Sequence, residues 1–471
     1  MARLRHLVVV VPGIGGSVLE TADGSPVWGQ GRRQLAGALV DPARLSLETY
    51  PQLRPVGLLE STRVLPWLVV PGYDELVCQL VNEFGLGTDD VDVACEGGVR
   101  KPGAEVVLFP YDFRLGVVVA AERLAAEMTR RLAARPGDRR QVVVLAHSMG
   151  GLVARHWLGP GGGAAHCRAL ITLGTPHRGA PKALDWLLNG VRLGPGPVAA
   201  MTSPLLNRAT KVLQQWTSTY DLLPRYDAVR DEASGTTLYP YQLGSDSFRQ
   251  RARTAFGVHR DIEKAWDALD PAERPEVLAV FARGHATPSR AVLRDGWVRV
   301  TKKADAEWLP NVGWRGDGTV PALSAIPIEL SDTVLARRAV PDRHGPMAIC
   351  AAAVDVLKEY AAEPFGSVRG DAPDGPWLGL DLDEVVAAGQ PFTVVAELLG
   401  TSDVQGASGW LRVAPEDGPA AEPVPMTGGD GRWELTVGGL APGAYWLTVE
   451  AVNVPRVDRV TGCDVVGVIE P

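Results

Sequence analysis

The segment 142–154 constrains the fold of this chain more than any other. It reads VVVLAHSMGGLVA, an apolar run followed by a serine among small residues and then by a second apolar run. A buried strand that leads through small-x-Ser-x-Gly into a helix is typical of a nucleophile elbow, a strained turn with the serine at its tip. Ala146 takes the place of the more frequent glycine, and Gly150 satisfies the other small position. This segment therefore favours Ser148 as a nucleophile held above a sheet.

The pattern around this segment predicts an α/β fold. Short β-branched runs alternate with longer helical patterns as far as residue 360, which is the signature of parallel strands joined by crossover helices. The runs are almost entirely apolar, as strands buried on both faces should be. We expect strands at 7–11, 106–109, 142–145, 169–173, 277–281 and 334–340. The predicted class is an α/β-hydrolase with a mainly parallel sheet and lid or cap insertions.

Two domains are expected, because 471 residues exceed the usual size of one compact domain. A Gly-, Pro- and Asp-rich run predicts a linker at 366–376. The catalytic domain would then span 1–365 and a second domain 377–471. Insertions at about 20–100 and 180–270 are too long for simple connections and predict lids or binding subdomains. The alternative is that these insertions only pack against the domain.

The C-terminal hundred residues carry the pattern of short β-strands. Trp433, Leu435 and Val437 alternate with polar or small residues, and the run LAPG then turns the chain into a second alternating run from Tyr445. We expect a hairpin here, and further strands at 392–398 and 409–413. This pattern predicts an immunoglobulin-like β-sandwich, in which LAPGAY would form a tyrosine corner.

A serine nucleophile needs an imidazole to take its proton and a carboxylate to orient that imidazole. In this fold the chain order is serine, acid, histidine. His344 follows the last expected strand, which favours it over the other downstream histidines, His156, His166, His177, His259 and His285. The acid is expected at Asp317, between two glycines in GDGTVP, although a surface Asp-Gly turn would look the same. Asp342 lies too close to His344 in sequence to be the preferred partner.

Two backbone N–H groups are expected to bind the oxyanion that forms during acyl transfer. One is the amide of Met149, directly after the nucleophile. The other is the amide of Ile14 in the loop VPGIGGS at 11–17, where glycines allow the backbone to approach closely. A dinucleotide-binding loop is a weak alternative, because the G-x-G-x-x-G spacing and the ribose-binding acid are not both present.

Five motifs in this order resemble the lecithin:cholesterol acyltransferase and lysosomal phospholipase A2 family of α/β-hydrolases. They are VPGIGGSVLE with Trp28 after it, PYDFR at 110–114, AHSMGG at 146–151, LGTPHRG at 173–179 and GDGTVP at 316–321. The resemblance covers about residues 1–360. It implies an acyl-Ser148 intermediate formed from a lipid ester and passed to water or an alcohol. It also implies that Asp112 and Arg114 pair as structural support beside the site.

Charge and composition restrict the partners. With a net charge of −8 and no stripe of Lys and Arg, the chain is not expected to bind nucleic acid. The expected substrate is a lipid or another ester, bound with the help of Trp28, Trp67 and His177, and a peripheral membrane contact stays open. No metal or other cofactor is expected, since the five cysteines lack metal-ligand spacing. The absence of a signal peptide and of a long apolar run predicts a cytoplasmic protein.

The leading functional hypothesis is a lipase, phospholipase or esterase with a Ser-Asp-His triad, to which O-acyltransferase activity could be added. The alternative is a partner-regulated, lipid-degrading effector whose C-terminal β-sandwich is a protein-binding module. A simpler role for that sandwich is stability or solubility.

Overall fold

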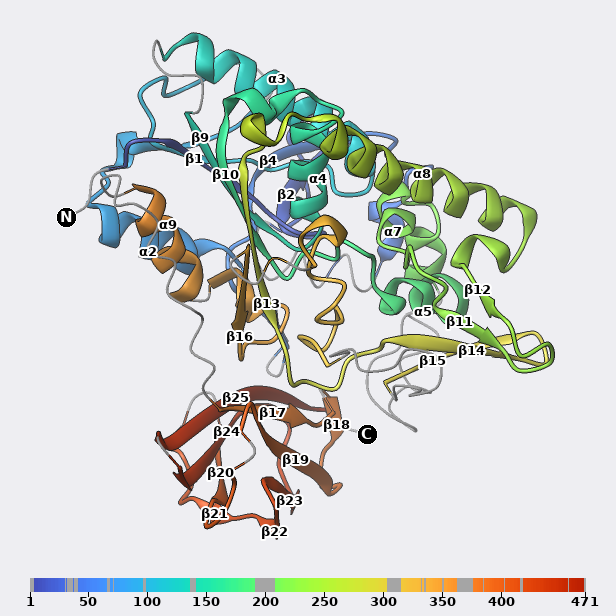
Figure 1. Ribbon diagram of the computed structural model, residues 1–471, viewed down its shortest axis with the longest axis vertical. Helices are drawn as coiled ribbons and strands as arrows, with labels where there is room; N and C mark the ends of the chain where they lie inside the picture. Colours follow the sequence, from blue (N-terminus) through green and yellow to red (C-terminus); the bar gives the residue numbers. More distant parts are fainter. Residues whose placement is uncertain are drawn as a thin grey trace.

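A seven-stranded sheet forms the centre of the larger domain (Figure 1). The strands lie in the order β16-β13-β10-β9-β1-β8-β7, and each neighbouring pair is parallel. Their bounds are β1 Leu7–Val11, β7 Val91–Val93, β8 Val106–Leu108, β9 Val142–His147, β10 Cys167–Leu173, β13 Glu276–Ala282 and β16 Arg337–Val340. The computed structural model describes residues 4–29, 31, 37, 41–65, 68–70, 72–95, 99–135, 141–190, 208–302, 315–331, 333, 336–349, 351–361, 376–383, 385–401, 403–415, 418–455 and 457–469.

Helices cover both faces of this sheet. Because successive side chains of a strand point to opposite faces, the odd-numbered residues of β1 pack with α3 and α4, whereas Val8 and Val10 pack on the side of α2 and α9. The helices are α2 Asp74–Phe84, α3 Val117–Ala133, α4 Met149–Leu158 and α9 Ala351–Ala361. Covering on both faces explains why the strand sequences are apolar at almost every position.

The predicted fold class is confirmed, since the larger domain has the parallel sheet and helical layers of an α/β-hydrolase. Sequence reasoning missed β7, which lies inside the stretch 20–100 that was interpreted as an insertion. Its three residues, Val-Asp-Val, are too few and too polar at the centre to stand out as a buried strand.

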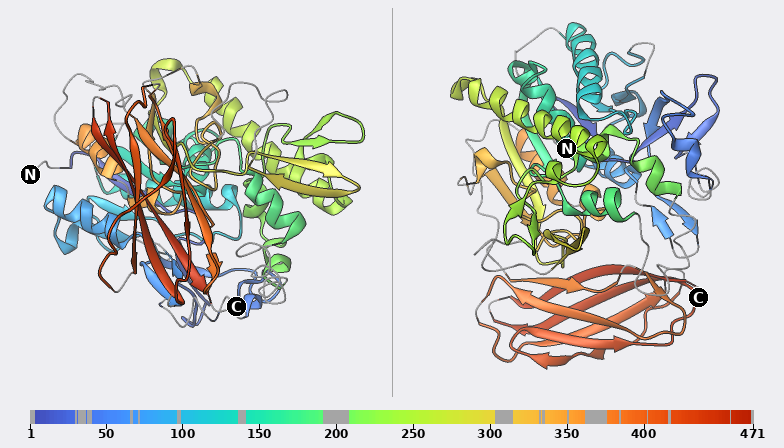
Figure 2. Two further views of the ribbon diagram at one scale, coloured as in Figure 1. Left: turned by 90° about the horizontal axis from the view of Figure 1, so that it is seen from below. Right: turned by 90° about the vertical axis from the view of Figure 1, so that its right-hand side faces the viewer.

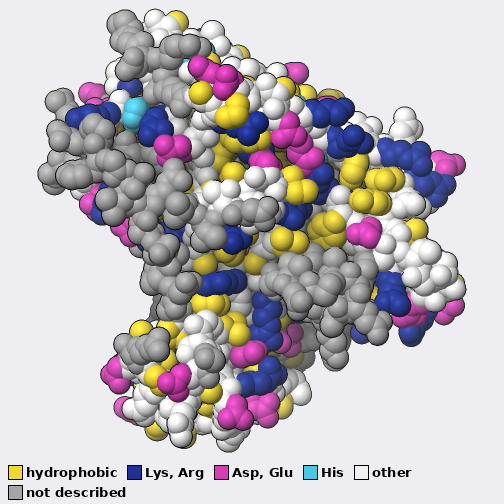
Figure 3. All heavy atoms as spheres, in the orientation of Figure 1, with side chains coloured by type: hydrophobic (Ala, Val, Ile, Leu, Met, Phe, Trp, Pro, Cys, Tyr) yellow, Lys and Arg dark blue, Asp and Glu magenta, His cyan; other side chains and the backbone are white. Residues whose placement is uncertain are grey.

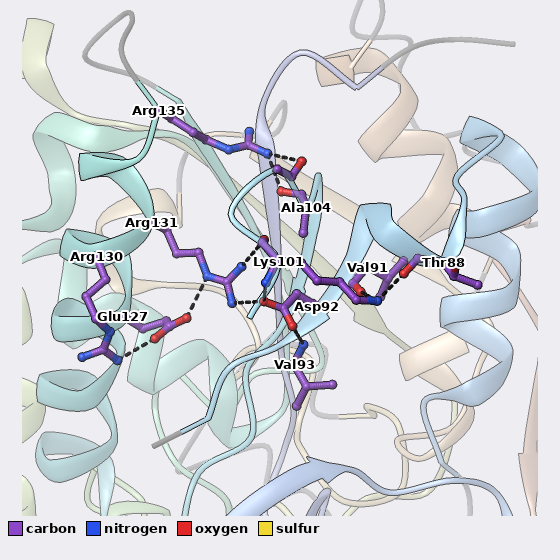
Figure 4. Close-up of polar contacts among 11 residues, drawn as sticks. Thr88, Val91, Asp92, Val93, Lys101, Ala104, Glu127, Arg130, Arg131 and Arg135 are labelled. Carbon is purple, nitrogen blue, oxygen red and sulfur yellow. Dashed lines mark hydrogen bonds and ion pairs between the residues drawn. The ribbon is translucent and has the colours of Figure 1, made fainter. Parts of the chain in front are cut away.

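A buried charge network explains the acid in β7 (Figure 4). Asp92 accepts a hydrogen bond of 2.7 Å from the Arg131 guanidinium on α3, and Arg131 also donates to Glu127 at 2.8 Å. These three side chains are no more than 3% exposed. Glu127 pairs in addition with Arg130, whose side chain is 45% exposed. The network ties the edge strand to the helix that covers it.

Replacing Arg131 by methionine should destabilise the protein by about 3–5 kcal/mol, because removing one partner leaves buried carboxylates without their cation. Urea unfolding followed by circular dichroism would measure the change. Arg130→Met is the matched control, since a pair with a solvent-exposed partner is worth at most about 1 kcal/mol. Equal destabilisation by the two variants would contradict this account.

The second predicted insertion, at about 180–270, forms most of a cap of helices and strands (Figure 1). A small sheet in the order β12-β11-β14-β15 extends from it. The stretch contains α5 Pro181–Asn189, α7 Thr217–Asp221, β11 Val229–Asp231, β12 Thr237–Leu238 and α8 Asp246–Ala268, and the cap is completed after β13 by β14 Arg290–Arg294 and β15 Trp297–Thr301. On the N-terminal side, the strands β2 Ser17–Glu20, β3 Pro26–Trp28 and β4 Arg54–Leu58 form a further small sheet. No helix within the described ranges is both long and apolar enough to cross a bilayer.

Two mainly antiparallel sheets form the C-terminal β-sandwich, which lies beyond one end of the larger domain (Figures 1 and 2). One sheet has the order β17-β19-β23-β22 and the other β18-β25-β24-β20-β21, in which only the β18–β25 pair is parallel. Their inner faces enclose a separate apolar core. The strands are β17 Trp377–Asp381, β18 Val385–Ala387, β19 Phe392–Leu399, β20 Ser408–Pro415, β21 Val424–Pro425, β22 Thr427–Gly429, β23 Arg432–Val437, β24 Gly443–Val454 and β25 Asp458–Ile469.

The expected hairpin between β23 and β24 is wrong. The two strands belong to opposite sheets, and the LAPG run carries the chain across the sandwich. The Tyr445 hydroxyl donates to the Ala441 carbonyl at 3.1 Å, which is the hydrogen bond of a tyrosine corner. Alternation predicts strands but does not say which sheet each strand joins. The predicted linker 366–376, apart from Pro376, lies outside the described residues.

Candidate active site

Ser148 stands at a strained turn between β9 and α4. Its φ of 51° and ψ of −125° are unusual for a residue with a side chain. A Cβ added at Gly150 would lie 2.5 Å from the carbonyl oxygens of Val11 and Pro12, and one at Gly151 would overlap the Thr175 side chain. The small residues are therefore required because the new helix passes directly against the sheet.

Ser148, His344 and Asp317 lie together in one hydrogen-bonded chain. The distance between Ser148 Oγ and His344 Nε2 is 2.9 Å, and that between His344 Nδ1 and Asp317 Oδ2 is 2.7 Å. A carboxylate only accepts, so Nδ1 carries the proton and Nε2 is free to accept from the serine hydroxyl. This is the arrangement that a general base needs in order to activate a serine.

Asp317 is held in place from both of its oxygens. Oδ1 accepts hydrogen bonds from the amides of Thr319 at 2.8 Å and Val320 at 2.6 Å, while Oδ2 faces His344. Burial on its own would raise the pKa of Asp317, but the imidazole and these two amides outweigh it and hold that pKa below its usual value. The carboxylate therefore stays ionised at neutral pH.

A pocket of about 280 Å³ opens at the serine hydroxyl. Its floor includes the loop Gly13–Gly16, which passes so close that a Cβ on Gly13 would lie 2.8 Å from that of Ser148. The volume is near the lower end for small-molecule sites. Most of the wall is apolar, with contributions from Trp28, Leu59, Trp186, Leu222, Val320 and Ala348.

A second hydrogen-bonded chain links this loop to the histidine. The Gly13 amide donates to the Tyr73 hydroxyl at 2.8 Å, Tyr73 lies 2.8 Å from His147 Nδ1, and His147 Nε2 lies 2.9 Å from the His344 carbonyl oxygen. Because a carbonyl only accepts, Nε2 must carry the proton of His147, and Tyr73 must donate to Nδ1. Each donor direction is thereby determined.

Burial keeps this second chain neutral. It lowers the pKa of His147 to about 3, with a smaller contribution from the nearby His344, and it raises the pKa of Tyr73. His147 is therefore uncharged at any working pH and orients its neighbours without taking a proton. The Gly13 amide already donates to Tyr73 and is not available to an oxyanion. The Ile14 amide, which is expected to donate to the oxyanion, follows it directly in the loop.

Tyr73→Phe should lower kcat by at least about 10-fold, because the Gly13–Ile14 loop would lose its anchor and an oxyanion donor is worth about 10²- to 10³-fold. It should also cost about 1–3 kcal/mol of stability, since the buried Gly13 amide loses its acceptor. Ester hydrolysis and thermal unfolding would measure the two effects.

Tyr226→Phe provides the control for this variant. The Tyr226 hydroxyl donates to the Ser289 carbonyl at 2.8 Å, and Tyr226 does not line the pocket. A similar loss of kcat in both variants would mean that Tyr73 contributes only to stability.

Asp112 and Arg114 form the pair that the family resemblance implies. Two hydrogen bonds join the side chains, at 2.8 and 2.6 Å, and both are buried. Asp112 also accepts from the Leu53 amide, and Arg114 donates to the Tyr50 carbonyl at 2.9 Å. The pair therefore fastens the segment around 45–53 to the core and does not touch the serine.

The three predicted substrate-binding residues have different outcomes. Trp28 lines the pocket, and its indole N–H donates to the Gly15 carbonyl at 2.8 Å. Trp67 lies outside the described residues. His177 does not line this pocket, which corrects the expectation. It is buried beside Thr172 and faces a separate small cavity with Arg155 and other residues, although Pro176 and Ala180 on either side of it line the pocket.

Sequence reasoning missed Tyr73 and His147. His147 ends β9 directly before the serine, so its side chain must lie near the site, and this position was a usable signal. Tyr73 carries no such signal in its own neighbourhood. Within the described residues, no group of three or more His, Cys, Asp or Glu side chains is arranged to hold a metal ion.

The parallel sheet and the strained serine turn define the class of this fold, the α/β-hydrolases. Residues 123–193, which include the turn, match the family model of the PGAP1-like alpha/beta domain. No curated protein matches the chain. The lecithin:cholesterol acyltransferase and lysosomal phospholipase A2 family is not the one whose model matches, so that resemblance stays a prediction.

Among solved structures, the chain matches the crystal structure of Bacillus licheniformis lipase BlEst2 in propeptide form. The match covers 98% of this chain and 93% of the other, with 12% sequence identity and a TM-score of 0.34. The strand order and the strained serine turn of this chain define the class of its fold.

Proposed function

We propose that this protein is a serine hydrolase that cleaves lipid esters through an acyl-Ser148 intermediate. The observation that supports it best is the chain from Ser148 through His344 to Asp317 at the base of a largely apolar pocket. The pocket would hold the acyl chain, and the triad would supply the chemistry.

Acylation would begin when Ser148 Oγ attacks the ester carbonyl carbon while its proton passes to His344 Nε2. The carbonyl oxygen becomes negative, and the amides of Met149 and Ile14 are proposed to donate to it. Asp317 stabilises the imidazolium that forms. His344 then gives its proton to the leaving alkoxide as the carbon–oxygen bond breaks, which leaves the acyl group on the serine and releases an alcohol.

Deacylation would repeat these steps with a different nucleophile. Water gives up a proton to His344, attacks the acyl carbonyl, and releases a carboxylic acid as Ser148 recovers its proton. An alcohol in place of water would give a new ester. Hydrolysis and acyl transfer therefore share one intermediate, and the concentration of acceptor would decide between them.

A substrate panel tests this proposal. Nitrophenyl esters of increasing chain length, triacylglycerol and phospholipid vesicles should be compared, the last because Lys182 also lines the pocket and suits a phosphate group. Rates that rise with acyl length would support a lipid ester substrate, and products formed with excess alcohol would reveal acyl transfer. No hydrolysis of any ester, together with no labelling of Ser148 by a fluorophosphonate, would refute the proposal.

A further inference from the structure

The β-sandwich contacts the loop that carries the candidate base. Arg343 directly precedes His344, and its Nε lies 2.5 Å from Oδ2 of Asp464 on β25. The two side chains are only 13% and 8% exposed, so the pair is shielded from solvent. Arg343 also lies against Gly318, the residue after Asp317, where its Nη1 would be 3.1 Å from an added Cβ. One arginine thus touches the sandwich and both catalytic loops.

A second connection runs through the segment 283–287, between β13 and β14. On the sandwich side, the Arg283 guanidinium lies 3.5 Å from the centroid of the Trp377 ring. Next to it, the backbone of Gly284 meets that of Gly379 so closely that a Cβ on Gly379 would lie 2.3 Å from the Gly284 oxygen. The sandwich is therefore packed directly against this segment.

The other side of the same segment holds the catalytic loops. Thr287 Oγ1 accepts hydrogen bonds from the amides of Gly316 and Gly318, both at 2.9 Å, on either side of Asp317. His285 exchanges two backbone hydrogen bonds with Gly316, and its Nε2 lies 2.7 Å from the Pro341 carbonyl oxygen. The segment thus links β17 to the loops of both the acid and the histidine.

Charge complementarity extends along this interface. Three ion pairs among the described residues cross it, and in each the cation belongs to the larger domain and the anion to the sandwich. They are Lys302–Asp381, Arg315–Glu397 and Arg343–Asp464. Lys and Arg side chains are visible where the two domains meet (Figure 3). Two of the cations, Arg315 and Arg343, lie in the loops that carry Asp317 and His344, where an independent solubility module would not need matched charges.

We propose that the β-sandwich braces the catalytic loops and that Asp464 is a positioning residue, which acts through Arg343 on His344. This inference rests on the proposed function. A displacement of about 1 Å of a catalytic group can cost about 10²-fold in rate. Arg343 is adjacent to His344 and in contact with Gly318, so losing its partner would loosen both the base and the acid.

Asp464→Asn in the full-length protein tests this proposal. It should lower kcat and the rate of fluorophosphonate labelling by about 10- to 100-fold. KM should be nearly unchanged, because Asp464 does not line the pocket. Asp464→Glu should restore part of the loss. Arg343→Met should show a similar loss, and combining it with Asp464→Asn should add little, as expected for two residues that act as one pair.

Asp381→Asn is the matched control. It removes the same charge from the side of the sandwich that meets the larger domain, but from β17 and not from β25, and its 3.9 Å pair with Lys302 is about half exposed and involves no residue of the catalytic loops. Wild-type kcat in Asp464→Asn would overturn the brace, and so would an equal loss in Asp381→Asn or a loss that only follows unfolding seen by circular dichroism. Failure of the proposed function itself would instead appear as an inactive, unlabelled wild-type protein.

Discussion

Replacing Ser148 by alanine should abolish ester hydrolysis, with a loss of about 10⁴- to 10⁶-fold in kcat, because no other atom can take the acyl group. Labelling by a fluorophosphonate should disappear at the same time. Folding should be unaffected or improved, since alanine removes only one oxygen from the turn. Hydrolysis of a nitrophenyl ester, with thermal unfolding of the same samples, would measure both properties.

Ser218→Ala is the matched control for this variant. Ser218 is fully buried in α7, and its hydroxyl has no hydrogen-bond partner among the described residues. The same chemical change there should leave the rate and the labelling at wild-type levels. Residual labelling of Ser148→Ala would show that another residue is the nucleophile.

Asp317→Asn should reduce kcat by about 10⁴-fold. The amides of Thr319 and Val320 both donate toward Oδ1, so the asparagine will keep its oxygen there and point its NH₂ group at His344. Nδ1 must then accept, the imidazole proton moves to Nε2, and Nε2 can no longer take the proton of Ser148. The loss therefore arises from the wrong tautomer and not from misfolding.

Asp342→Asn separates this explanation from a general effect of charge. Asp342 lies two residues before His344 and is partly buried, but it is not hydrogen-bonded to the imidazole in the way that Asp317 is. Its replacement should change kcat by less than about 3-fold, because kcat falls only when an interaction made in the transition state is lost. Steady-state kinetics would decide, and a larger loss in Asp342→Asn than in Asp317→Asn would reassign the acid.

Local patterns predicted the centre of this fold well. The strand, turn and helix around Ser148 carry their own constraints, since Gly150 is required by the close approach of Val11 and Pro12, and Gly151 by that of Thr175. Chain order then indicated where an acid and a histidine should be sought. The structure brings those three side chains into hydrogen-bonding distance.

Features that depend on distant parts of the chain could not be predicted in this way. The exchange of β23 and β24 between sheets is decided by packing across the sandwich core, which alternation does not encode. His177 looked like a pocket residue because it follows a strand, but its side chain is buried beside Thr172 and lines another cavity. The role of Tyr73 depends on contacts with Gly13 and His147, which lie far from it in sequence.

The place of β1 in the sheet has a consequence for how this protein folds. Its five residues are buried and pair with β8 on one edge and β9 on the other, so Val8 meets Val106 and Val143. During translation, β1 is synthesised about a hundred residues before β8 and still longer before β9. Parallel pairs between strands that are distant in sequence form slowly. Until they form, the apolar strand is exposed and prone to aggregation. We expect nascent chains to depend on chaperones, and refolding yields to fall as protein concentration rises.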